Sequence, residues 1–404
     1  MEVKENIYIR VGTQYYKKAF KPLISGDKAE QLLKWTPETI RQDYGKEYLS
    51  KVEKFDGFCC VPSHLHYKRN IYNFYNTYEP LNIKPSKSGN IQTTLNFLKH
   101  MFGKQYELGL DYIKILFDKP VQMLPVLCFV SNERGTGKTT FINYLKLIFQ
   151  KNMTFNTNED FRSQFNSDWS TKLIIAIDEV LLDKKEDSER IKNLSTSKTY
   201  KENAKFINKG EIEFFGKFIL CSNNETNFIK IDSLETRYWV IKVPVIKKTD
   251  INLLGKLKSE IPAFINYLLT REYYSKWEDR MWFNEKLIIT DALKRIKANS
   301  RAKLEIEFVL FVNRIFEDFN IDEYKFCVND VIQILKNYSI QAGQNTVRNL
   351  LKNKWKIEPI SNSSTYKKYI LNHENEIYEV SGKGRYYTVT KSFLLKNFDD
   401  LMTL

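Results

Sequence analysis

The stretch VLCFVSNERGTGKTT, residues 126–140, constrains the fold of this chain more than any other feature of its sequence. Residues 126–130 are an apolar run with valine at both ends, which is typical of a buried strand, and residues 141–149 have the apolar spacing of an amphipathic helix. Two glycines and a Lys-Thr pair lie between these elements. A strand, a glycine loop, Gly-Lys-Thr and a helix in this order predict a P-loop in an α/β domain.

This loop offers the groups that bind the phosphates of ATP. Backbone N–H groups around Gly135 and Gly137 can approach phosphates without Cβ clashes, and the helix N-terminus adds favourable partial charge. Lys138 is expected to reach the β- and γ-phosphates, and Thr139 to place its hydroxyl on Mg²⁺. The expected ATP-binding residues are Asn132, Glu133, Arg134, Gly135, Thr136, Gly137, Lys138, Thr139 and Thr140. The alternative is an ordinary glycine-containing turn with a chance lysine.

Asn132 departs from the usual P-loop pattern, which begins with a glycine five residues before Gly137. Asparagine adopts left-handed backbone angles more readily than most residues. We therefore expect the loop to tolerate Asn132, and no catalytic group is put in doubt.

Two carboxylates end an apolar strand pattern at residues 172–180, KLIIAIDEV. Asp178 is expected at the carboxyl edge of the sheet beside the P-loop, where it can hold Mg²⁺ together with Thr139. Glu179 is expected to polarise the attacking water. The alternative, a buried strand followed by an ordinary acidic turn, is disfavoured because the pair follows Lys138 by 40 residues.

A hairpin and another apolar strand follow the acidic pair. Residues 200–207 and 211–215 are predicted to be two strands joined at Asn208-Lys209-Gly210, a tight-turn signal. Residues 218–222 predict a strand that ends at Asn223. An amide at that position can contact the γ-phosphate and the water, and Asn224 is the competing candidate for this sensor role.

Arg237 lies fourteen residues beyond Asn223, at the edge of a further predicted strand in ETRYWVIKVP. An arginine at this place can reach the nucleotide of a neighbouring subunit as an arginine finger. The alternative is a surface salt bridge. The predicted catalytic set is therefore Lys138, Asp178, Glu179, Asn223 and Arg237.

The order of these motifs resembles that of the superfamily 3 helicases, a branch of the AAA+ ATPases. The segments TNEDFRSQFNSDW, DEVLLDKKEDSERIKNLST and FFGKFILCSNNE are similar to those of helicase modules in phage and plasmid primase-helicases, related to the poxvirus type. The resemblance covers residues 95–250 and extends loosely into the flanks. It implies an α/β fold: an AAA+ P-loop ATPase core with a mainly parallel sheet and a helical lead-in at residues 95–124.

The resemblance also implies a hexameric ring that uses ATP to translocate 3′→5′ on one DNA strand. In such a ring the hairpin projects into the central channel, and Lys205 and Lys209 match its basic residues. Residues 1–90 contain no paired-Asp strand motif, so a primase and other replication proteins are expected on separate chains. The competing interpretation is an AAA+ protein that binds DNA or assembles partners in response to nucleotide, without unwinding.

Composition and charge are typical of a folded protein that binds a polyanion. The net charge is +14, and 42% of the residues are hydrophobic. The five cysteines show no metal-binding or disulfide spacing. The N-terminus lacks the apolar core of a signal peptide, and no apolar run has membrane-spanning length. The expected setting is the bacterial cytoplasm, for a protein of a phage, plasmid or integrated element.

The flanks complete a predicted division into residues 1–90, 91–300 and 301–404. In the first part, His64 and His66 form a His-x-His pair that could hold the metal of a nicking endonuclease, with Tyr72 or Tyr75 as nucleophile. A structural or incidental pair is favoured, because the tyrosines follow almost at once and little chain precedes them.

The last part has the order of a winged helix. A helix through Phe316 and helices at 328–338 and 344–353 precede a strand pair in IYEVSGKGRYYTVT, predicted to turn at residues 382–384. The residues expected to contact DNA here are Arg348, Lys352, Lys383 and Arg385. The alternative is a winged-helix-like domain that binds protein or packs within the ring.

Overall fold

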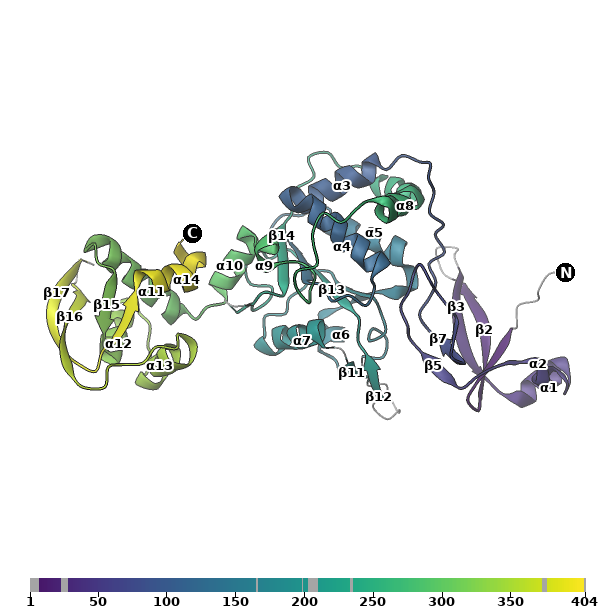
Figure 1. The fold of residues 1–404 in the computed structure, drawn as a ribbon, viewed down its shortest axis with the longest axis horizontal. Helices are drawn as coiled ribbons and strands as arrows, with labels where there is room; N and C mark the ends of the chain where they lie inside the picture. The colour runs from purple at the N-terminus through teal and green to yellow at the C-terminus, as the bar shows by residue number, and fades with distance from the viewer. Residues whose placement is uncertain are drawn as a thin grey trace.

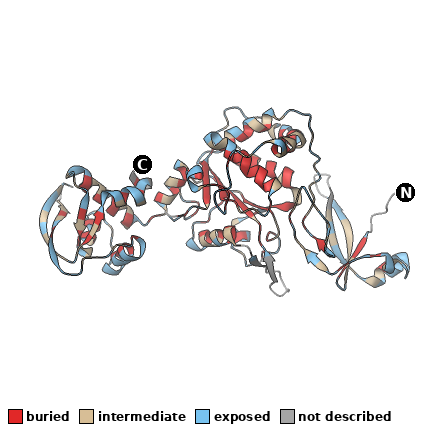
Figure 2. Cartoon of the chain, in the orientation of Figure 1, coloured by how far each residue is buried: buried red, intermediate tan, exposed pale blue. Residues whose placement is uncertain are grey.

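The structure, a computed structural model, describes residues 7–22, 28–164, 166–197, 199–202, 210–232, 235–372 and 376–402. Figure 1 shows three parts along the long axis of the molecule: N-terminal strands at one end, a central α/β part, and a C-terminal part at the other end. Buried residues concentrate in the central sheet and the helices around it (Figure 2). Within the described ranges, no helix is both long enough and apolar enough to cross a membrane.

Five parallel strands form the central sheet. They are Val126–Val130 (β8), Met153–Asn156 (β9), Ile174–Ile177 (β10), Lys217–Ser222 (β13) and Tyr238–Lys242 (β14). Their spatial order is β14-β8-β13-β10-β9, and every neighbouring pair is parallel. All residues of β8, β10 and β13 are buried, as expected for parallel strands covered on both faces. The predicted mixed α/β fold with a parallel sheet is confirmed.

Helices cover both faces of this sheet. They are Gln92–Phe102 (α3), Gly103–Gln105 (η1), Tyr106–Asp118 (α4), Lys138–Phe149 (α5), Gln150–Asn152 (η2), Asn158–Arg162 (α6), Lys185–Thr196 (α7), Leu253–Thr270 (α8), Glu285–Ile288 (α9) and Asp291–Asn299 (α10). Alternate residues of β8 point to opposite faces. Leu127 and Phe129 therefore share a core with α3, α4, α5 and α8, whereas Val126, Cys128 and Val130 pack with α6, α7 and α10. The helical lead-in, which breaks at Gly103, forms as predicted.

The predicted hairpin is described at its base. Thr199–Glu202 (β11) and Gly210–Glu213 (β12) pair antiparallel, with Glu202 opposite Gly210. Lys205 and Lys209 lie outside the described residues, so their predicted places, on a strand and at the turn of the hairpin, stay a prediction.

The N-terminal part contains small sheets. Its elements are Tyr8–Val11 (β1), Gln14–Pro22 (β2), Lys28–Trp35 (β3), Pro37–Tyr44 (α1), Tyr48–Lys51 (α2), Glu53–Phe55 (β4), Gly57–Cys59 (β5), Asn70–Ile71 (β6) and Phe74–Asn76 (β7). The strand orders are β3-β2-β1-β4 and β5-β7-β6. The hydrophobic clusters of this part end at Tyr75. The predicted boundary at residue 90 stays a prediction.

The C-terminal part has its own hydrophobic core, which runs from Ala298 to Leu401. Its elements are Lys303–Asp318 (α11), Glu323–Phe326 (β15), Val328–Asn337 (α12), Gln344–Asn349 (α13), the π-helical turn Leu350–Lys354 (η3), Ser364–Leu371 (β16), Ile377–Gly384 (β17), Tyr387–Thr390 (β18) and Lys391–Met402 (α14). The helices predicted at 328–338 and 344–353 are present.

The prediction of a strand pair that turns at Gly382, Lys383 and Gly384 is wrong. These residues lie inside β17, which pairs antiparallel with β16, while β18 pairs with β15. A Cβ on Gly382 would lie 2.8 Å from the ring of Tyr366, its partner across the strands. The glycine therefore makes room for an aromatic ring and does not form a turn, a role that the sequence pattern does not distinguish.

Candidate functional site

The loop of residues 132–140 connects β8 to α5 at the carboxyl edge of the sheet. Gly135 and Gly137 have φ angles of 69° and 92°, a region that residues with a Cβ rarely adopt. A Cβ on Gly137 would also lie 3.1 Å from the ring of Phe97 and 3.2 Å from Ile246. These glycines are therefore required by the backbone of the loop, and their predicted role in letting phosphates approach stays a prediction.

Asn132 holds the start of this loop by its backbone N–H and by its side-chain amide oxygen. Its N–H donates to Glu225 Oε1 (3.0 Å), and its Oδ1 accepts from the N–H of Glu225 (3.2 Å). Glu225 is buried, which favours its neutral form, but its ion pair with Lys242 (2.8 Å) and the Asn132 N–H lower the pKa of the carboxyl. The φ angle of Asn132 is not positive, so the expected left-handed backbone is not how the chain accommodates this residue.

The loop and two strand ends enclose a cleft of about 410 Å³. It is lined by Arg134, Gly135, Thr136, Gly137, Lys138, Thr139, Thr140, Asp178, Glu179 and Asn223. Most of the predicted phosphate-loop residues and both acidic residues thus meet Asn223 around one hollow, although they come from three separate stretches of chain. Of the other predicted residues, Asn132 braces the loop from outside the cleft lining, Glu133 is exposed, and Arg237 lies elsewhere.

The charged and hydroxyl groups of the cleft are held in place by each other. The Thr139 hydroxyl donates to Asp178 Oδ2 (2.8 Å), and Lys138 Nζ donates to the Thr136 hydroxyl (3.1 Å). Burial lowers the pKa of Lys138, so a bound anion would be favoured because it restores a counter-charge. A hydroxyl and a carboxylate at this separation are hard oxygen ligands suited to Mg²⁺. Among the described residues, no group of three His, Cys, Asp or Glu side chains is placed to hold a metal by itself.

Glu179 occupies an unusual backbone conformation. Its φ angle is 51°, and its N–H donates to Asp178 Oδ1 (3.1 Å). The next residue is tied to the sheet, because Val180 N–H donates to the carbonyl of Cys221 (2.8 Å). Left-handed angles at a non-glycine residue cost free energy and concentrate at functional sites. Here they turn an exposed carboxylate toward the cleft.

The two candidate sensor residues have different environments. Asn223 is exposed and lines the cleft. The Asn224 side chain instead accepts from the N–H groups of Thr226 (2.9 Å) and Asn227 (2.8 Å), which fixes the loop after β13. Of the two amides, only that of Asn223 lines the cleft.

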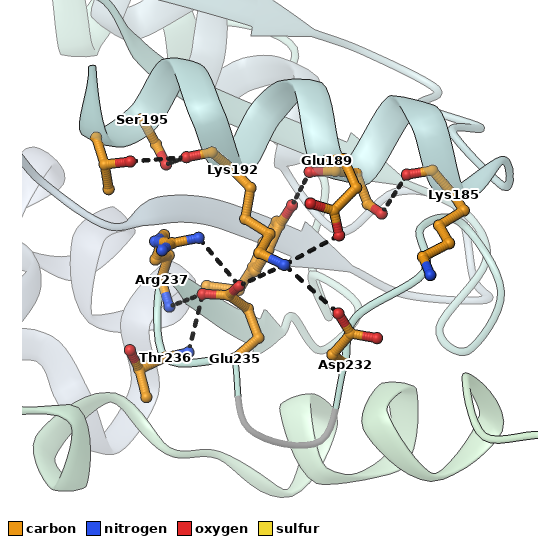
Figure 3. A network of polar contacts seen from close by, with 11 residues as sticks. Lys185, Glu189, Lys192, Ser195, Asp232, Glu235, Thr236 and Arg237 are labelled. Atoms are coloured by element: carbon orange, nitrogen blue, oxygen red, sulfur yellow. Dashed lines mark hydrogen bonds and ion pairs between the residues drawn. The ribbon is translucent and has the colours of Figure 1, made fainter. Parts of the chain in front are cut away.

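Arg237 lies at the opposite, amino edge of the sheet. Its carbonyl accepts from Val126 N–H (2.8 Å), at the first residue of β8. Its guanidinium pairs with Glu235 (3.2 Å), whose carboxylate also contacts Lys192 of α7 (3.4 Å), as Figure 3 shows. The salt bridge that was the alternative for Arg237 therefore exists, but it is partly buried, and a role in a neighbouring subunit stays a prediction.

The sequence did not single out two residues that brace the cleft. One is Glu225, and the other is His100 of α3, whose Nε2 bonds the carbonyl of Thr136 (2.9 Å). The contact with an acceptor places the proton on Nε2. An acidic residue just after the two asparagines was the available signal for Glu225. His100 lies on an ordinary amphipathic helix and carried none.

His64 has a structural role. Its ring bonds the carbonyl of Phe117 (2.9 Å) and the hydroxyl of Tyr78 (2.6 Å), whereas His66 is exposed. Burial, only partly offset by the Phe117 hydrogen bond, lowers the pKa of His64 to about 4. Both ring nitrogens are occupied by these contacts, which supports the structural alternative over a metal site.

The predicted C-terminal DNA contacts are exposed and partly engaged within the chain. Arg348 bonds Gln344 (3.1 Å), Lys352 pairs with Glu358 (3.3 Å), and Arg385 donates to the carbonyl of Ile360 (3.1 Å). Lys383 lies within β17, opposite Thr365. Because these contacts are solvent-exposed, they hold the side chains weakly.

The fold and site together define an α/β protein with a polar cleft at the carboxyl edge of a parallel sheet. A family model described as a family of unknown function (DUF5906) matches residues 129–237. The match begins within β8 and ends at Arg237, so it contains the cleft. The chain is also 28% identical, over 180 residues, to the DNA primase-polymerase of Nitratiruptor phage NrS-1. The aligned part is 42% of this chain. It covers 25% of that relative's length.

Solved structures of that phage protein share the fold. The apo structure of the NrS-1 C terminal region (305-718) superimposes with a TM-score of 0.64 at 17% identity, covering 92% of this chain and 95% of that chain. The A form apo structure of the same region gives a TM-score of 0.62 at 17% identity, covering 95% of each chain. At this identity the likeness is one of fold.

Proposed function

We propose that this chain is an ATP-hydrolysing motor of phage DNA replication, with the AAA+ core of a superfamily 3 helicase. The observation that carries the proposal is the cleft, in which a lysine, a hydroxyl–carboxylate pair, a second carboxylate and an amide surround one hollow. These groups match the needs of phosphoryl transfer to water: charge on the phosphates, a magnesium site, a base and a sensor.

The strand order supports the AAA+ part of the proposal. Because β13 lies between β8 and β10, Asn223 is delivered between the phosphate loop and the acidic pair. Because Arg237 immediately precedes β14, which runs parallel to β8, it lies at the amino edge, roughly 16 Å from the carboxyl edge for five strand residues. A side chain there cannot serve its own cleft but can serve that of a neighbour, as in a hexameric ring.

The roles of the residues follow from their positions. Lys138 and the loop N–H groups bind the β- and γ-phosphates, and Thr139 and Asp178 would hold Mg²⁺. The ion, when bound, would offset phosphate charge. Glu179 would orient and deprotonate the attacking water, and Asn223 would contact that water and the γ-phosphate. Glu225, His100 and Asn132 keep the loop in shape for this chemistry.

The DNA part of the proposal rests on other features. The chain is basic overall, a hairpin projects from the central part between β10 and β13, and the matched relative is named a DNA primase-polymerase. Three helices followed by the β16–β17 hairpin support a winged-helix-like module, which could contact DNA or protein. We propose single-stranded or forked DNA as the partner, and the host cytoplasm as the setting, with priming supplied by another chain.

Strand displacement on forked DNA tests the proposal. The chain should separate the strands with ATP and Mg²⁺, and the Glu179→Gln variant should bind ATP but neither hydrolyse it nor unwind. Normal hydrolysis by Glu179→Gln would contradict the assignment of the base. DNA-stimulated hydrolysis without strand displacement would instead support an assembly factor that switches with nucleotide.

A further inference from the structure

The contacts of Arg237 are more elaborate than a surface salt bridge. Glu235 Oε1 accepts from the N–H groups of Thr236 and Arg237 (both 3.0 Å), and its Oε2 accepts from Arg237 Nη1 (3.2 Å). Glu235 itself is 7% exposed. One buried carboxylate therefore fixes both the backbone and the head group of Arg237 (Figure 3).

A second cation shares this carboxylate. Lys192 Nζ lies 3.4 Å from Glu235 Oε2, and it also contacts Glu189 (3.0 Å) and Asp232 (3.5 Å). The lysine belongs to α7, so it links this helix to Glu235 in the segment that precedes β14. A buried carboxylate that faces two cations is held more firmly than one that faces a single cation, because its lost hydration is better replaced.

Helix α7 is the first helix after the acidic pair. Five residues separate Glu179 from its first residue, Lys185. This short connection is tied to the segment between β13 and β14, since Leu182 N–H donates to the carbonyl of Phe228 (2.6 Å). Helix α7 also contacts β14, because the Tyr238 hydroxyl donates to the carbonyl of Ser188 (3.5 Å). The helix thus joins the acidic end of one cleft to the arginine at the opposite edge.

We infer that Glu235 is the positioning residue for Arg237, and that Lys192 braces Glu235 from α7. This inference rests on the proposed function, in which Arg237 completes the ATP site of a neighbouring subunit. Among the described residues no hydrogen bond involves Nη2 of Arg237, so a guanidinium held at Nη1 and at the backbone keeps its Nη2 donors for a phosphate. Such pre-orientation lowers the cost of ordering a long side chain at the moment of reaction.

The test compares Glu235→Gln with a matched control, Glu189→Gln. The glutamine keeps an acceptor for the two backbone N–H groups but loses the charge that holds the guanidinium. Glu189→Gln removes a carboxylate that contacts Lys192 and not Arg237. We expect Glu235→Gln to lower kcat for ATP by roughly 10- to 100-fold with little change in KM. Glu189→Gln should stay close to the parent chain.

The decisive readout is the double variant. If Glu235 acts through Arg237, adding Glu235→Gln to Arg237→Ala should cause no further loss of kcat. The inference would be overturned if Glu235→Gln lowered kcat equally in the parent chain and in the Arg237→Ala variant. It would also be overturned if Glu189→Gln lowered kcat as much as Glu235→Gln does. Mixing Glu235→Gln subunits with Lys138→Ala subunits should also recover activity, because the defect lies on the side presented to the neighbour.

Folding is checked by thermal unfolding and particle size. If Glu235→Gln is unfolded, Lys192→Met takes its place, with a smaller expected loss of kcat that again vanishes in the Arg237→Ala background. A folded Glu235→Gln or Lys192→Met variant with unchanged kcat would refute the positioning role. The proposed function fails separately: in that case Arg237→Ala alone would leave turnover unchanged.

Discussion

The two edges of the central sheet carry different kinds of polar and charged group. At the carboxyl edge, Thr139, Glu179 and Asn223 are exposed, and the buried Lys138 donates to a neutral hydroxyl, that of Thr136. At the amino edge, Glu235 and Lys217 are buried, and Lys217 donates to the carbonyls of Phe215 (2.7 Å) and Pro120. Burial lowers the pKa of Lys217 to about 7.

The contrast separates polar groups that are open to a ligand from polar groups that already bond other groups of the chain. Exposed polar side chains can exchange water for a ligand at little cost. A buried ion pair is costly to break, because a lone buried charge is expensive. Changes at the carboxyl edge should therefore affect turnover directly, and those at the amino edge should affect a neighbour or the stability of the fold.

The largest expected effect is that of Lys138→Ala at the carboxyl edge. Hydrolysis should fall to background and ATP binding should weaken, because the phosphates lose their main positive charge. Turnover assays and equilibrium binding of a fluorescent ATP analogue measure the two effects. Near-normal turnover would remove the phosphate-loop assignment.

Arg237→Ala should cost roughly 10³-fold or more in turnover while ATP affinity is largely kept. The contrast between edges predicts that the loss acts in trans. Mixing Arg237→Ala with Lys138→Ala subunits should then restore some activity, because one interface regains both halves. Intact assemblies that recover nothing at any mixing ratio would place the arginine in its own subunit's chemistry.

Asn223→Ala and Asn224→Ala form a matched pair beside the cleft. Asn223→Ala should lower kcat by roughly 10²-fold, because an amide that contacts the reacting phosphate is removed. Asn224→Ala should instead lower the free energy of unfolding by about 1 kcal/mol, through the loop N–H groups it leaves unpaired, with kcat little changed. The reverse result would exchange the two roles.

Replacing both Lys205 and Lys209 with alanine tests the predicted role of the hairpin. DNA-stimulated ATPase and unwinding should fall while basal ATPase is kept, because no group at the nucleotide changes. The salt dependence of single-strand binding should decrease by about 0.7 in log–log slope for each phosphate that the hairpin no longer neutralises. Wild-type unwinding over a range of salt would mean that these lysines only keep the hairpin soluble.

The smallest expected effect on turnover is that of His64, which contacts the end of α4. Its folded pKa lies below the value in the unfolded chain, so the unfolded state binds more protons as pH falls below about 6.5, and stability decreases. The free energy of unfolding should drop by about 1 to 2 kcal/mol between pH 7 and pH 5 from this group. Urea unfolding of His64→Asn should lose this part of the pH dependence, whereas the exposed His66→Asn should keep it.

Local sequence pattern was enough to predict several elements of the central part. Apolar runs predicted β8, β10 and β13, and the position of Gly103 predicted the break between α3 and α4. It was enough for the cleft as well, because a strand followed by Gly-Lys-Thr, a strand followed by Asp-Glu and a strand followed by Asn must place these residues at one edge of a parallel sheet. Periodicity and backbone requirements are properties of neighbouring residues, and a single chain displays them.

The local sequence pattern did not predict the contacts between segments that are distant along the chain. The sequence pattern predicts a turn at Gly382, since a glycine that leaves space for Tyr366 cannot be told by sequence from one that turns the chain. The pairing of Asn132 with Glu225, of His100 with Thr136 and of Arg237 with Glu235 depends on which strands become neighbours. A side chain's partner is set by packing in three dimensions, and its spacing along the chain does not specify that partner.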